Sequence, residues 1–85
     1  MVEAPFFVYR VVPQDKVRRG QPPVMPWTGI APSAAAAVAS AASVLRLPPG
    51  LRVAVFRRDV LVIGSAWVHC ATCAVSEAPE ALAGL

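Results

Sequence analysis

The sequence predicts an α+β protein with a small sheet of three to four strands, one alanine-rich helix on one face of the sheet, and a long proline-rich arm. The sheet would combine an N-terminal strand with a C-terminal β-meander. Runs of β-branched and aromatic residues near both ends predict the strands, and an alanine-rich run between them predicts the helix. The arm is predicted because five of the nine prolines lie within residues 13–32. A chain of 85 residues makes one domain, residues 1–85.

The first strand is predicted at residues 6–12, where the run FFVYRVV has high β-propensity and is followed by Pro13. Side chains alternate between the two faces of a strand, and here both faces are mostly apolar. One face holds Arg10 together with Phe6, Val8 and Val12. The other face holds Phe7, Tyr9 and Val11.

The arm at residues 13–32 excludes a helix or a central strand, because proline lacks a backbone donor and fixes φ. It also carries large apolar residues that disordered linkers avoid. We therefore expect an extended, polyproline-like arm that binds a partner surface through Val24, Met25, Trp27 and Ile30. For Trp27 the alternative is that the indole folds back onto its own sheet.

The helix is predicted at residues 34–47, between the N-cap residue Ser33 and the helix-breaking Pro48. Its apolar stripe is narrow and consists mostly of alanine, so the helix can pack closely but buries little area. Further strands are predicted at residues 51–58, 60–63 and 66–75, with turns at Arg58-Asp59 and Gly64-Ser65. Residues 76–85 are expected to form a short helical turn or a frayed tail.

The composition indicates that the chain completes its core against another molecule. Hydrophobic residues make up 56% of the sequence and charged residues only 15%. A domain of this size buries somewhat more than ~60% of its unfolded surface, so its own core stabilises it only marginally. These features predict a non-enzymatic protein-interaction or assembly subunit, which either self-associates or joins a larger complex.

A nucleic-acid-binding module is the first alternative, because the formal net charge is +3. The candidate phosphate contacts are Lys16, Arg18 and Arg19 of the arm, with Arg57 and Arg58. No aromatic residue is interleaved with the basic residues of the arm, so that segment offers no platform for base stacking. The other interpretation is that these charges are solvated and keep an apolar protein soluble.

A small thiol or zinc protein is the second alternative, because Cys70 and Cys73 form a Cys-x-x-Cys motif beside His69. Three adjacent ligands are one short of a zinc cage. If the segment is a strand, the two cysteines lie on opposite faces and cannot bond to each other. We therefore interpret both as buried structural residues and predict neither a metal nor a cofactor.

The sequence contains no recognisable catalytic set. The five carboxylates form no pair, and the single histidine has no evident carboxylate to orient it. The N-terminus lacks the basic region of a secretion signal, so we expect the chain in the cytoplasm or in a particle assembled there. The longest charge-free runs are too short or too rich in proline and alanine to favour a membrane span.

Overall fold

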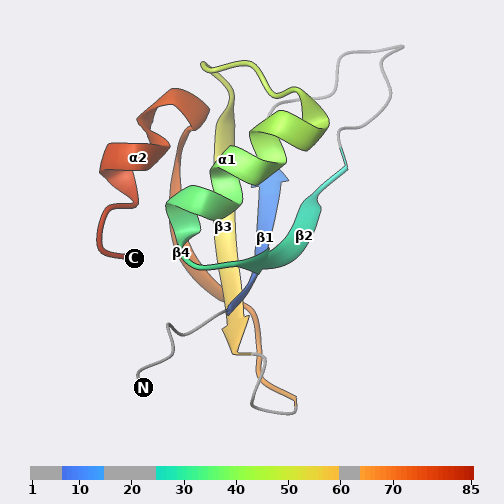
Figure 1. Cartoon of the computed structure of the whole chain (residues 1–85). Coiled ribbons are helices and arrows are strands. Elements are labelled where there is room, and N and C mark those ends of the chain that lie inside the picture. The colour runs from blue at the N-terminus through green and yellow to red at the C-terminus, as the bar shows by residue number, and fades with distance from the viewer. Residues whose placement is uncertain (1–6, 15–24, 60–63) are drawn as a thin grey trace.

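The fold is a four-stranded antiparallel sheet with two short helices on one face (Figure 1). The computed structural model describes residues 7–14, 25–59 and 64–85. In chain order the elements are β1 (Phe7–Pro13), β2 (Trp27–Ala31), α1 (Ala34–Leu45), β3 (Arg52–Asp59), β4 (Val68–Ala74), the 3-10 turn η1 (Val75–Glu77) and α2 (Ala78–Ala81). The α+β class predicted from the sequence is therefore confirmed.

The strands are arranged in the order β2-β1-β3-β4, so the first and third strands of the chain lie at the centre. Val11 of β1, for example, lies opposite Trp27 of β2 on one side and opposite Val55 of β3 on the other. Residues that lie opposite each other in neighbouring strands point to the same face of a sheet. The register therefore shows which described side chains of the sheet point towards the helices and which point to the opposite face.

The hydrophobic core lies between the sheet and the two helices, and its helical side is built from small residues. Alanine side chains let α1 approach the sheet closely, whereas the strands supply larger valines and Tyr9. The buried cluster consists of Tyr9, Val11, Ala31, Ala34, Ala37, Val38, Ala41, Leu51, Val53, Val55, Cys73, Ala78 and Leu82. Leu82, which follows α2, is 1% exposed and is among the largest fully buried side chains.

Side-chain and backbone caps fix both ends of α1. Ser33 has an extended backbone, and its Oγ accepts a hydrogen bond of 3.1 Å from the Ala36 N–H. Arg46 follows the last turn with φ 53°, in the left-handed region, and the Leu47 N–H donates to the Ala42 carbonyl at 3.0 Å. The helix begins where the sequence predicted and ends at Leu45, two residues before the predicted end.

The proline-rich arm is not confirmed, because its last part is a strand. Residues 27–31 form β2 at the edge of the sheet, where they pair with β1. Pro26 and Pro32 flank this strand without interrupting it, and an edge strand tolerates such neighbours because its outer side needs no ladder hydrogen bonds. The part of the arm at residues 15–24 lies outside the described residues.

The predicted β-meander also needs correction. A tight turn at Arg58-Asp59 is wrong, because β3 continues through Asp59, which pairs with Phe7 of β1. β3 then pairs directly with β4 in antiparallel register. The strand predicted at residues 60–63 lies outside the described residues, and Gly64, with φ 78°, lies in a turn as expected.

Candidate binding face of the sheet

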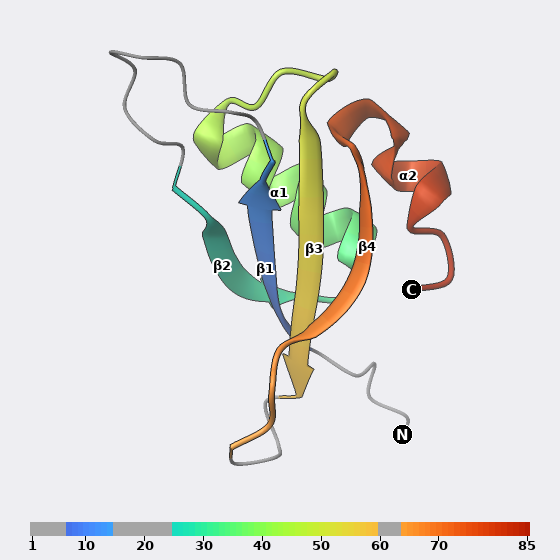
Figure 2. The ribbon, with the colours of Figure 1, turned by 180° about the vertical axis from the view of Figure 1, so that it is seen from behind.

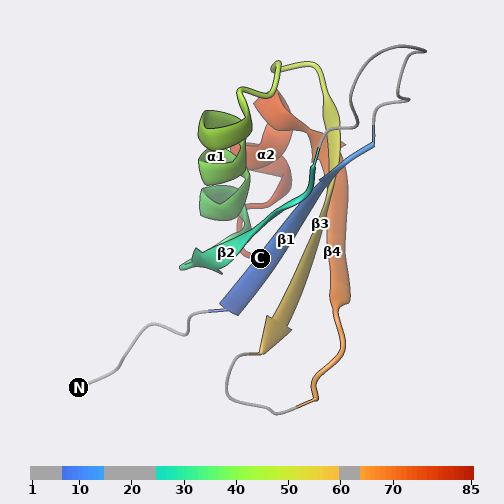
Figure 3. The same ribbon diagram turned by 90° about the vertical axis from the view of Figure 1, so that its right-hand side faces the viewer.

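The sheet is covered on one face only by the described elements. In the side view both α1 and α2 lie on the same side of the four strands (Figure 3). Seen from behind, the strands stand in front of α1, and no described helix or strand lies over them (Figure 2). We call this side of the sheet the open face. The register places Arg10 there, between Thr28 of β2 and Phe56 of β3.

Two arginines contact one tryptophan on the open face. The Arg10 Cζ lies 5.0 Å from the centroid of the Trp67 ring, and the Arg58 Cζ lies 5.5 Å from it. Arg10 comes from β1, Arg58 from β3, and Trp67 from the segment just before β4. Guanidinium groups at such distances are attracted by the negative face of an indole. The contacts therefore hold Trp67 against the open face.

A β-bulge adds a histidine to this face. Ala71 lies opposite Val55, but the next pair joins His69 to Phe56, so Cys70 is the extra residue of β4. Without the bulge Cys70 would lie opposite Phe56. The extra residue brings His69 to the open face instead, where its ring centroid lies 5.3 Å from that of Phe56, edge to face at 66°.

The His69 ring also contacts Thr72, which belongs to the same strand, β4. Its Nε2 lies 2.9 Å from the Thr72 Oγ1, within hydrogen-bonding distance. Thr72 lies opposite Ala54 of β3, whose side chain also points to the open face. Both His69 and Thr72 are exposed. The edge of the ring is thus positioned by the strand, while part of the ring remains accessible to solvent.

The described acidic side chains lie on the other side of the molecule. Glu77 belongs to η1 and Glu80 to α2, and both elements lie in the helical layer (Figure 3). The open face has Arg10 in the middle of β1, Arg58 close to the end of β3 and Arg52 at its start. Within the described part of the chain the open face is therefore cationic.

The predicted phosphate contacts do not share one face of the sheet. Arg58 points to the open face, whereas Arg57 points to the helix-covered side, where its Cζ lies 4.9 Å from the centroid of the Phe7 ring. Burial raises the pKa of the Tyr9 phenol, and the neighbouring Arg57 acts in the opposite direction. Lys16, Arg18 and Arg19 lie outside the described residues.

The four predicted partner-binding residues do not form one surface. Trp27 is half-buried against the core on the helix-covered side, and its ring lies so close to Gly29 that a Cβ there would be 2.6 Å from the Trp27 Cζ2. Ile30 is 66% exposed and points to the open face, and Met25 is 68% exposed. Val24 lies outside the described residues.

Both cysteines are free and contact the core. Cys73 is buried, and Cys70 is partly buried against the core cluster, with its Sγ 3.8 Å from the Val68 carbonyl oxygen. The expectation that they lie on opposite faces is wrong, because the bulge at Cys70 breaks the alternation. Burial, followed by the charge of Glu77, raises the pKa of the Cys73 thiol. His69 points away from both, and no three His, Cys, Asp or Glu side chains in the described segments are grouped to hold a metal ion.

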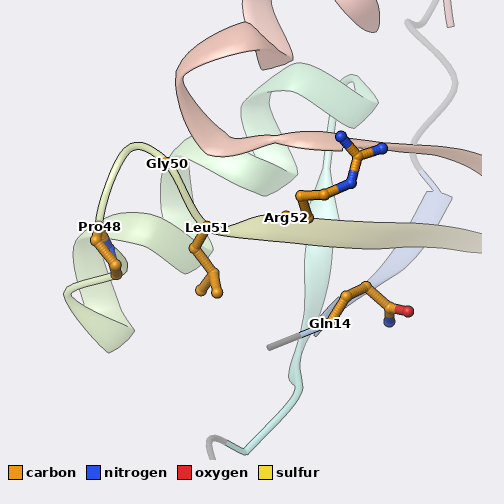
Figure 4. A pocket seen from close by; sticks show the side chains of 5 residues that line it. All are labelled: Gln14, Pro48, Gly50, Leu51 and Arg52. Atoms are coloured by element: carbon orange, nitrogen blue, oxygen red, sulfur yellow. The ribbon is translucent and has the colours of Figure 1, made fainter. Parts of the chain in front are cut away.

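One shallow hollow lies at the end of the sheet, where the loop after α1 meets β3. Five residues line it: Gln14, Pro48, Gly50, Leu51 and Arg52 (Figure 4). Arg52 and Gln14 extend their polar groups on either side of β3 in this view. The lining combines one cation and one amide with apolar and backbone groups, which is not a set for acid–base or nucleophilic catalysis.

The aromatic residues beside the arginines are not evident from the sequence. The turn predicted at Arg58-Asp59 gave no reason to expect an aromatic neighbour, and the basic segment of the arm contains no aromatic residue. Trp67 contacts Arg10 although the two residues are far apart in the chain. The only local signal was the position of Arg10 on an otherwise apolar strand face.

Comparison with known protein families, with characterised proteins and with solved structures found no match. None of the helices described in the structure has the length and apolar character that would let it cross a bilayer. The function must therefore be inferred from the open face itself.

Proposed function

We propose that this chain is a non-enzymatic interaction module, a subunit of a larger complex, and that the open face makes the contact. The observation that carries the proposal is that the described helices cover only one face of the sheet (Figure 3). An apolar sheet normally buries both faces or presents a polar outer face to water. Here the outer face combines Phe56, Trp67 and Ile30 with arginines.

The residue types on the open face suit binding more than catalysis. Tryptophan and arginine are the residues that most often dominate the energy of protein interfaces. Trp67 already lies beneath two guanidinium groups. Its side chain is therefore partly ordered before a partner binds, which lowers the entropic cost of binding. Cations and aromatic rings act through noncovalent contacts, and this supports a binding role.

Photocrosslinking from the two sides of the molecule tests this proposal. A benzophenone amino acid replaces Thr28, which is exposed on the open face, or Ser43, which is exposed on α1. Each variant is produced in the native cells of the protein and irradiated. We expect a discrete crosslinked species from position 28 and none from position 43. The same products from both positions, or none from position 28, contradict the proposal.

A further inference from the structure

We infer that the partner of the open face is single-stranded nucleic acid, which binds the cluster formed by Arg10, Phe56, Arg58, Trp67 and His69. This inference rests on the proposed function, because it names the partner of the same face. We call these five residues the cation–aromatic cluster. Their contacts place two positive charges and three aromatic rings on one side of three neighbouring strands and the segment that leads into the last of them.

The charges of the cluster select an anionic partner. Arg10 and Arg58 both point to the open face, while Glu77 and Glu80 lie in the helical layer (Figure 3). If a second copy of the chain bound this face, the arginines of the two copies would lie close together. Repulsion between these like charges disfavours such a dimer. A polyanion instead gains from both guanidinium groups, each of which is exposed.

The rings distinguish a nucleic acid from an acidic peptide. Carboxylate side chains satisfy arginines but have no π-face for Phe56, Trp67 or His69 to stack on. Nucleobases have such a face, and proteins that bind single strands combine cationic side chains with aromatic platforms. Arginine also stacks on bases, so Arg10 and Arg58 can exchange their contact with Trp67 for a base and a phosphate.

The shape of the face favours unpaired over paired bases. Reading a duplex requires an element that enters a groove, such as a helix or a two-stranded ribbon. Both described helices lie on the far side of the sheet, so the cluster has none above it (Figure 2). Bases within a duplex are stacked on each other and cannot reach Phe56 or Trp67. Unpaired bases can lie flat on these rings.

Fluorescence titration with a ten-nucleotide oligothymidylate tests the inference. We expect the oligonucleotide to quench part of the tryptophan emission and to bind more weakly as salt increases. Substitution W67F should abolish the quenching, because Trp27 lies on the helix-covered side. A duplex of the same length and polyglutamate serve as competitors, and both should compete at least tenfold less well than the oligonucleotide.

A charge-matched pair of variants locates the site. Arg58→Gln and Arg46→Gly each remove one positive charge, but Arg46 lies at the C-terminal cap of α1, away from the open face. We expect R58Q to weaken binding at least fivefold and to reduce the salt slope by about 0.7, the value for one phosphate contact to a single strand. R46G should stay within twofold of the unmodified protein and keep its slope. Circular dichroism confirms that each variant is folded.

Several results would overturn the inference. Equal losses in R58Q and R46G would mean that diffuse charge, not the cluster, attracts the oligonucleotide. Equal competition by polyglutamate or by the duplex would mean that the face does not recognise unpaired bases. No binding at low salt would also refute it. If crosslinks from position 28 then reach a protein, the proposed interaction module stands while its nucleic-acid partner does not.

Discussion

At the scale of single residues, Cys73 illustrates how position in the sheet decides the chemistry of a side chain. The residue is 5% exposed and belongs to the buried cluster formed by the sheet and the helices. Desolvation disfavours the thiolate, so the neutral form is retained to higher pH than in the unfolded chain. Arg52 acts in the opposite direction but does not cancel the effect of burial.

We expect the free energy of unfolding to fall as pH rises above about 8.5, the ordinary pKa of a cysteine thiol. Below that pH the Cys73 thiol is protonated in both the folded and the unfolded chain, so its ionisation does not lower the free energy of unfolding. Above it the unfolded chain loses the proton first, which favours unfolding. Urea titrations at pH 7 and pH 9.5 measure how far the free energy of unfolding falls between these pH values. In the C73A variant this decrease should be smaller. An unchanged difference in C73A would show that another group is responsible; the Tyr9 phenol, whose pKa is also raised, is the first candidate.

At the scale of secondary-structure elements, local sequence predicts what each segment forms better than what it touches. Residues 34–45 form a helix because alanine favours it and Ser33 caps it. Residues 52–59 and 68–74 are strands because apolar and β-branched residues fit a partly buried sheet. These propensities belong to the segments themselves, so they can be recognised without knowledge of the fold.

The features that form the open face are not local. The bulge at Cys70 reverses the orientation of His69, and nothing within the run VHCATCA specifies where an extra residue will be accommodated. Trp67 meets Arg10 only because β1 and β3 are central neighbours. The edge strand β2 was missed because its flanking prolines outweighed the β-branched Thr28 and Ile30. The candidate site depends on register and strand order. Because tertiary packing determines both, the site could not be predicted from the local sequence.

The N-cap of α1 gives a prediction at the same scale. Ser33→Ala removes the acceptor for the Ala36 N–H and should lower the free energy of unfolding by about 1 kcal/mol. Thermal or urea unfolding followed by circular dichroism at 222 nm measures the change. Ser33→Asp is the matched control, because aspartate accepts the same hydrogen bond, and it should retain most of the stability. A neutral effect of Ser33→Ala would mean that tertiary packing alone holds the start of the helix.

At the scale of the whole molecule, the two faces of the sheet have separate tasks. The helix-covered face supplies the strand residues of the buried cluster, including Val11, Val53 and Val55 from the two central strands. The open face contributes solvent-exposed arginines and partly exposed rings. Stability should therefore depend on one face, and binding on the other. This separation lets a small domain keep an accessible aromatic surface without relying on that surface to fold.

Two substitutions on opposite sides test this separation. Leu82→Ala empties a site that is 1% exposed beside the sheet and α1, and should cost ~2–5 kcal/mol of unfolding free energy through lost burial and the cavity left behind. Arg58→Gln removes only an exposed contact with Trp67 and should cost about 1 kcal/mol or less. Urea unfolding of both variants measures the difference. If R58Q destabilises the chain as much as L82A, the arginine–tryptophan contacts serve the fold, and the open face is not free to exchange them for a partner.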